Sequence, residues 1–169
     1  MYPQVDETLE NALKKSDDSL LKKFKITLLT RKWETEPHCI MISHFSDDSN
    51  ESEDTYDSES RNLKYLIFIK TSKIDDLAYL ESMKKLGKVV YRIKKVLRNT
   101  KDMIYINEEN MRVDLREGLK IGQIVPEIDN YVIKSSQMEI NIPVDEEDLE
   151  ILDGDFDKIT TKDSIKWGD

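Results

Sequence analysis

The two histidines and the single cysteine are the side chains best suited to metal binding or nucleophilic chemistry. His38 and His44 lie six residues apart around a predicted strand, so both would lie on one face while Cys39 points to the other. Zinc sites need several Cys and His ligands at characteristic spacings, and this chain has no such cluster. The sequence therefore predicts no metal site, and Cys39, which has no second cysteine to pair with, is interpreted as a buried structural thiol.

Other chemical motifs are equally sparse. The run 153–157 alternates aspartates as a calcium loop does, but its glycine is misplaced and no glutamate follows at the required distance. An acidic turn is the simpler interpretation. Five glycines leave little room for a phosphate-binding loop, and no nucleophile elbow is present. We expect no catalytic residue and no cofactor, and the chain is predicted not to be an enzyme.

Charge is distributed unevenly along this chain of net charge −9. Residues 46–60 carry seven acids and no base, and residues 143–169 carry ten acids and three lysines. Residues 61–142 carry sixteen bases and eleven acids. Oppositely charged surfaces on one molecule suit head-to-tail contacts between copies, because complementary patches steer association. A monomer with solvated acidic loops fits the same counts.

A strand predicted at residues 63–70 is the central element, because it is rich in β-branched and aromatic residues. A second strand is predicted at 39–45. The acidic loop 46–60 would join the two as a hairpin with an unusually long connection. Loops of that length are usually functional or disordered, so this one is predicted to be a contact arm or unstructured when alone.

A long amphipathic helix is predicted at residues 74–98. Its apolar positions recur at steps of three and four, which places them on one side: Tyr79, Leu80, Met83, Leu86, Val89, Val90, Ile93, Val96 and Leu97. The opposite face is basic: Lys84, Lys85, Lys88, Arg92, Lys94, Lys95 and Arg98. This basic face could meet an anionic surface, although a solvated lysine face is the simpler alternative.

The remaining pattern predicts a short N-terminal helix at 6–15 and several further strands. These strands are expected at 24–30, 103–106, 111–116, 121–125, 131–133 and 137–142. Residues Met111, Val113, Leu115, Met138, Ile140 and Ile142 should face inward, and Pro126 and Pro143 should end their strands. The fold class is therefore α+β, a mixed or antiparallel sheet of about four to six strands packed against one long amphipathic helix and a short N-terminal helix.

The length of 169 residues indicates a single domain, with 38% hydrophobic residues to form its core. We place this domain at 1–143 and interpret 144–169 as an acidic arm that orders on a partner, since it mixes Phe156 and Trp167 with its acids. No apolar run is long enough to cross a bilayer, and the first seven residues lack a basic and then apolar leader. We therefore expect a protein used in a cytoplasm, or in a particle assembled there.

The order of parts resembles that of the tail terminator (tail completion) proteins of long-tailed bacteriophages, and of related neck or ring proteins of head-to-tail connectors. The likeness is closest over 39–97. It comprises the strand at 40–45, the Ser/Asp/Glu-rich loop, the strand at 65–69 and a helix that begins Asp-Asp-Leu-Ala-Tyr-Leu-Glu-Ser. As topology it extends over about residues 5–142.

The resemblance implies a virion protein, assembled in the host cytoplasm, that forms a ring, commonly a hexamer. Such a ring caps the tail tube, ends its polymerisation and joins the tail to the head, with sheath, tube or neck proteins as partners and DNA passing through its lumen unread. The functional parts would be interfaces, and no membrane is involved. The candidate interface residues are Asp47, Asp48, Glu51, Glu53, Asp54, Asp57, Glu59, Lys84, Lys88, Arg92, Lys95, Phe156 and Trp167.

Two other classes remain open. A monomeric acidic interaction protein would use its acidic clusters in place of phosphates against a basic partner, although the basic helix face is unusual for such a mimic. A nucleic-acid binder would use that helix face directly, but the net charge of −9 opposes phosphate contacts.

Overall fold

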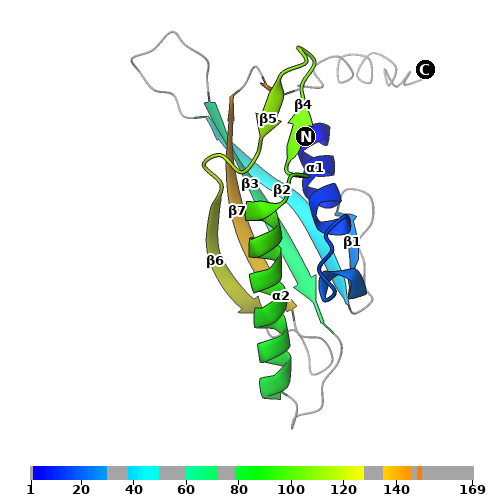
Figure 1. The fold of residues 1–169 in the computed structure, drawn as a ribbon. Coiled ribbons are helices and arrows are strands. Elements are labelled where there is room, and N and C mark those ends of the chain that lie inside the picture. The colour runs from blue at the N-terminus through cyan, green and yellow to red at the C-terminus, as the bar shows by residue number, and fades with distance from the viewer. Residues whose placement is uncertain are drawn as a thin grey trace, which may run out of the picture.

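The fold is seen in a computed structural model that describes residues 2–29, 38–49, 60–71, 79–127, 135–145 and 148–149. Two helices and seven strands follow one another along these residues (Figure 1). Their bounds are α1 Pro3–Lys14, β1 Lys25–Leu28, β2 Cys39–Ser49, β3 Ser60–Lys70, α2 Tyr79–Asn99, β4 Ile104–Ile106, β5 Arg112–Asp114, β6 Lys120–Glu127 and β7 Ser135–Asp145. A 3₁₀ turn at Leu21–Lys23 links α1 to β1.

Five of the strands form one mixed sheet in the order β1-β2-β3-β7-β6. Only the β1–β2 pairing is parallel. The predicted α+β class, with a mixed sheet of four to six strands, is confirmed at this level. β3 is the middle strand, as its apolar sequence predicted, and β2 pairs with it antiparallel.

Both helices lie on the same face of the sheet, as Figure 1 shows. In α1 the residues Val5, Leu9, Ala12 and Leu13 are buried, which is the spacing of one helical stripe. Pro3 sits in the first turn, where its missing N–H costs nothing. The short N-terminal helix is therefore confirmed, with its start three residues earlier than expected.

The apolar stripe of α2 faces the sheet as predicted. Leu86, Val89, Val90, Ile93 and Leu97 are buried, and Val96 is half-buried against the same core. The side chains of Tyr79, Leu80 and Met83, and the predicted helix start at 74–78, lie outside the described residues.

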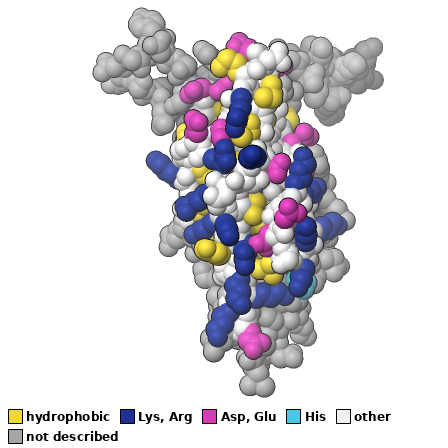
Figure 2. Space-filling model, viewed as in Figure 1, with side chains coloured by type: hydrophobic (Ala, Val, Ile, Leu, Met, Phe, Trp, Pro, Cys, Tyr) yellow, Lys and Arg dark blue, Asp and Glu magenta, His cyan; other side chains and the backbone are white. Residues whose placement is uncertain are grey.

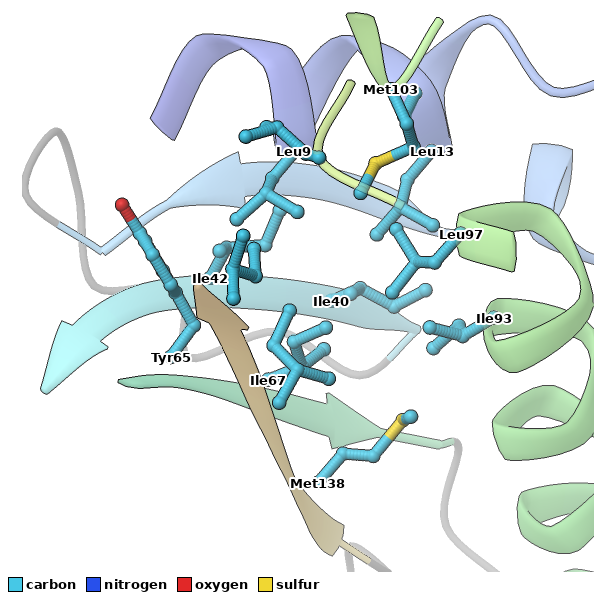
Figure 3. Close-up of a cluster of buried hydrophobic side chains, with 14 of the residues drawn as sticks. Leu9, Leu13, Ile40, Ile42, Tyr65, Ile67, Ile93, Leu97, Met103 and Met138 are labelled. Atoms are coloured by element: carbon cyan, nitrogen blue, oxygen red, sulfur yellow. The ribbon is translucent and has the colours of Figure 1, made fainter. Parts of the chain in front are cut away.

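The core fills the space between this sheet face and the two helices (Figure 3). Ile40 and Ile42 of β2 and Ile67 of β3 lie beneath Leu9 and Leu13 of α1 and Ile93 and Leu97 of α2, with Met138 and Met103 at the margins. All of these side chains are at most 1% exposed. Such close packing makes the position of each helix depend on both the sheet and the other helix.

A short hairpin of β4 and β5 covers the end of the core next to α1. Val113 and Leu115 point inward as predicted, but Met111 is 57% exposed and that prediction is wrong. Met111 precedes β5, in the turn where its backbone N–H donates to the Asn107 side chain. The strand alternation therefore does not extend to it.

The prolines predicted to end strands lie inside them instead. Pro143 pairs with Asn62 of β3, and Pro126 pairs with Ser136 of β7. A proline is tolerated where its nitrogen faces no neighbouring strand. β6 is an edge strand, and beyond Asn141 β7 has no described neighbour except β3, so at each proline one side of the strand has no described partner.

The predicted strand at 131–133 lies outside the described residues. Within the described helices, none combines the length and the apolar composition that a membrane crossing requires.

Candidate functional site

The outer face of α2 is a strongly cationic surface. From residue 79 to residue 99 the helix carries seven bases and one acid, Glu81. The predicted residues Lys84, Lys88, Arg92 and Lys95 are all exposed, as are Tyr91 and Arg98. We call these six residues the basic stripe, and Figure 2 shows lysine and arginine side chains gathered over α2.

The basic stripe is poorly neutralised by the rest of the described chain. Arg92 reaches Asp18, after α1, with 3.4 Å between Nη1 and Oδ2. No described acid forms an ion pair with Lys84, Lys88 or Lys95. The surface is therefore available to an anionic partner, and each exposed ion pair that forms there would contribute up to about 1 kcal/mol.

An open groove of about 350 Å³ lies where the basic stripe ends, between the turn after α1 and the last turns of α2. Lys15 and Lys95 line it together with Asp17 and Asp18, and Val96 supplies an apolar wall. Its mixed charges do not define a ligand. The groove extends the contact surface of α2 toward α1.

Asp47 was predicted to lie in the acidic loop, and the structure corrects this. It belongs to β2, where a bulge between His44 and Ser46 inserts Phe45 as an unpaired residue. The bulge turns Phe45 outward, 64% exposed, and brings Asp47 opposite Leu63, on the helix-covered face. The sequence alternation alone could not show this shift.

On that face, Asp47 has two partners within the molecule. Tyr2 Oη donates a 2.5 Å hydrogen bond to Asp47 Oδ2, and Arg61 Nη1 donates to the same oxygen at 3.1 Å. The hydrogen bond from Tyr2 holds the pKa of Asp47 below its usual value, and Arg61 acts in the same direction. Asp47 therefore fastens α1 to β2 and β3, and is not part of a free acidic surface.

A buried polar cluster lies next to this contact. Asp6 of α1 is 4% exposed and accepts a 2.6 Å hydrogen bond from the hydroxyl of Tyr65, in β3. Burial raises the pKa of Asp6, and burial together with the Asp6 charge raises the pKa of Tyr65. The spacing of Asp6 from Leu9 and Leu13 was the available signal, because it places a carboxylate on the apolar stripe of α1.

His44 packs edge-on between Tyr2 and Tyr65, with ring centroids 5.4 and 5.2 Å away. Burial lowers its pKa, although Asp6 and Asp47 oppose that shift. His38, in contrast, lies near Lys85 of α2, with 3.1 Å between Nε2 and Nζ. The two histidines therefore have different neighbours and form no common site.

The other candidates contribute less to this picture. Cys39 is buried, as predicted. Asp48 was also predicted to lie in the acidic loop, and this too is corrected, because β2 continues to Ser49 and pairs Asp48 with Asn62 of β3. Glu51, Glu53, Asp54, Asp57, Glu59, Phe156 and Trp167 lie outside the described residues. Sequence reasoning missed Tyr91, whose signal was an aromatic residue on the lysine side of the helix.

No group of three or more metal-binding side chains occurs among the described residues. Comparison of the sequence with models of known families gave no match, and a search of curated proteins found no similar sequence.

Proposed function

We propose that this chain is a structural assembly protein that forms a ring at the end of a bacteriophage tail tube. The ring would stop tube polymerisation and join the tail to the head or neck. DNA would pass through its lumen without specific contacts, and no catalytic residue or cofactor takes part.

The observation that supports this proposal most is the order of elements. A helix is followed by the β2–β3 hairpin around an acidic segment, then by α2, then by the closing strands β6 and β7. With β1, these four strands build one mixed sheet that has both helices on one face. This is the plan on which the resemblance to tail terminator proteins rests. The resemblance is one of pattern and order.

The basic stripe supplies independent support for self-association. A chain of net charge −9 that exposes a cationic helix face offers two oppositely charged surfaces, which favours contacts between copies over contacts with free nucleic acid.

The test is the mass of the purified full-length chain by light scattering, over a concentration series at about 0.05 M and 0.5 M salt. We expect a discrete oligomer near six copies, or a monomer that forms rings when purified tail tubes are added, visible by negative-stain electron microscopy. Salt at the higher level should weaken assembly, since it screens surface charges. A strict monomer that ignores the tubes contradicts the proposal, and a monomer that binds a basic protein supports the acidic mimic instead.

A further inference from the structure

We propose that the acidic C-terminal segment 150–169 of one copy binds the basic stripe of α2 on a second copy. This inference rests on the proposed function in one respect, namely that copies of the chain meet. It assigns a partner to the basic stripe, namely the C-terminal segment of another copy, so that the contact runs from the C-terminal segment of one copy to α2 of the next.

The acceptor is a regular row of cations. Lys84, Lys88 and Arg92 are four residues apart, and Lys95 follows at three, so that successive charges are about 4.5 to 6 Å apart along the helix axis. The row from Lys84 to Arg98 is about 21 Å long. Only Arg92 is paired with a described acid, so the row has capacity for additional carboxylates.

The donor leaves the folded core at a fixed point. Leu149 is 7% exposed and belongs to the core. Just before it, Asp148 accepts two hydrogen bonds of 2.7 Å, one from the Tyr105 hydroxyl to its backbone oxygen and one from the Asn107 amide to its carboxylate. The following twenty residues therefore start from an anchored position beside β4, and fully extended they span up to about 66 to 72 Å. That reach exceeds the length of the stripe and extends to a neighbouring molecule.

The sequence of the donor matches the acceptor in charge and spacing. Residues 150–157 contain four acids and no base. Bound in an extended conformation, the chain would place Asp153, Asp155 and Asp157 on one side, about 6.6 Å apart, which is close to the spacing of the cations on α2. Several charges would then pair at once.

A second copy is a better partner for the C-terminal segment than α2 of the same chain. If the segment bound α2 of its own chain, both charged surfaces would be occupied and none would remain to join copies. Exchange between copies leaves one free donor and one free acceptor at the ends of a chain of molecules, and such a heterologous contact can close into a ring.

The experiment uses two full-length variants. The acceptor variant carries Lys84→Glu and Lys88→Glu, and the donor variant carries Asp153→Lys and Asp155→Lys. We expect each alone to associate at least tenfold more weakly than wild type in analytical ultracentrifugation at low salt. Their equimolar mixture should regain strong association, because each C-terminal segment then meets a helix of opposite charge on the other variant: the wild-type segment meets the wild-type helix, and the reversed segment meets the reversed helix. A chain with all four changes should associate again, since its charges are complementary once more.

The matched control is Arg112→Glu with Lys120→Glu, which makes the same change in net charge at exposed positions away from α2. It should associate as wild type does, and circular dichroism should show that every variant is folded. Carboxylates can also be cross-linked to lysines in a mixture of ¹⁵N-labelled and unlabelled wild type. We expect cross-links between the C-terminal segment and α2 in which one peptide is labelled and the other is not, as a contact between two molecules requires.

Three results would overturn the inference: wild-type assembly by each variant alone, no regained association in their mixture, or cross-links between the C-terminal segment and α2 only within one label. These results leave the ring proposal intact if wild type still assembles. A wild-type chain that stays monomeric with tail tubes present contradicts the ring itself, whereas association in the variant mixture would still support the contact between the C-terminal segment and α2.

Discussion

Tyr65 and Asp6 share a buried 2.6 Å hydrogen bond that joins β3 to α1 across 59 positions of the chain. Tyr65 is fully buried and Asp6 nearly so, and Tyr65 is the one donor described for this carboxylate. A buried carboxylate without a donor is costly, so the pair holds the N-terminal helix at one place on the sheet.

Tyr65→Phe is expected to lower the free energy of unfolding by about 1 to 3 kcal/mol, because it leaves the Asp6 carboxylate buried without this donor. Urea unfolding at pH 7 measures the change. Tyr91→Phe is the matched control, since the Tyr91 ring is 63% exposed and its substitution should change stability by less than about 0.5 kcal/mol. Equal effects of the two substitutions would mean that the Asp6 contact contributes nothing.

His44 should make stability fall as the pH is lowered. Burial places the pKa of His44 in the folded protein below the ordinary 6.5. As the pH falls below 6.5, His44 is therefore protonated in the unfolded chain before it is protonated in the folded one. The free energy of unfolding decreases over this range, until the pH reaches the folded-state pKa. His44→Asn should lose less stability than wild type between pH 7.5 and pH 5.5, as measured by urea unfolding. Asp6 and Asp47 face this ring and are present in both proteins. An equal loss in the two proteins, or an NMR titration of His44 at 6.5 or above, would contradict the assignment.

Deletion of Phe45 should cost far less stability than removal of the Asp47 carboxylate. Phe45 is the unpaired residue of the bulge, so without it His44 still lies opposite Tyr65 and Asp47 still lies opposite Leu63. Asp47→Ala removes the acceptor of the hydrogen bonds from Tyr2 and Arg61, and we expect it to lower the free energy of unfolding by about 1 to 3 kcal/mol. Chemical denaturation of both variants provides the comparison, and a deletion that costs more than Asp47→Ala would show that the bulge itself is needed.

The two faces of α2 should differ sharply in mutational cost. Leu86 is 3% exposed, so Leu86→Ala should destabilise by about 2 to 5 kcal/mol through lost packing and a residual cavity. Lys88→Ala, two positions away on the exposed side, should change stability by less than about 0.5 kcal/mol. Thermal and urea unfolding of both variants tests the orientation of the helix, and similar costs would mean that the orientation is wrong.

Two glycines should respond to alanine with opposite signs. Gly118 has φ of +69°, and an added Cβ would lie 2.6 Å from Pro143 Cγ, so Gly118→Ala should destabilise by more than about 1 kcal/mol. Gly87 lies inside α2 with nothing described within 4 Å, so Gly87→Ala should stabilise by up to about 1 kcal/mol. The melting temperatures of the two variants should therefore move in opposite directions. A stabilising Gly118→Ala would exclude the close approach to Pro143.

Local periodicity was sufficient to predict several elements. The steps of three and four from Leu86 to Leu97 placed α2 with its cations outward, because a helix repeats every 3.6 residues whatever it packs against. The apolar run around Ile67 identified the middle strand for a similar reason, since only a strand buried in a sheet tolerates such a sequence. The hairpin of β2 and β3 followed from the order of these strands.

Other features depended on partners that are distant in the sequence. Pro143 looked like a strand end, yet β7 continues through it because no described strand lies on its other side there. Met111 continued an alternating pattern, yet it lies in a turn bonded to Asn107. In both cases the residue type is compatible with two environments, and the neighbouring element chooses between them.

The sequence by itself determined where this protein carries its charges, namely a cationic helix face and an acidic C-terminal segment, because charge and helical period are local properties. Only the tertiary structure decided that Asp47 fastens α1 to the sheet and that Asp6 is buried beside Tyr65. A single inserted residue at the bulge sets the first, and packing across 59 residues sets the second. Neither contact follows from the two-residue repeat of a strand or the 3.6-residue repeat of a helix, because each arises where one element packs against another.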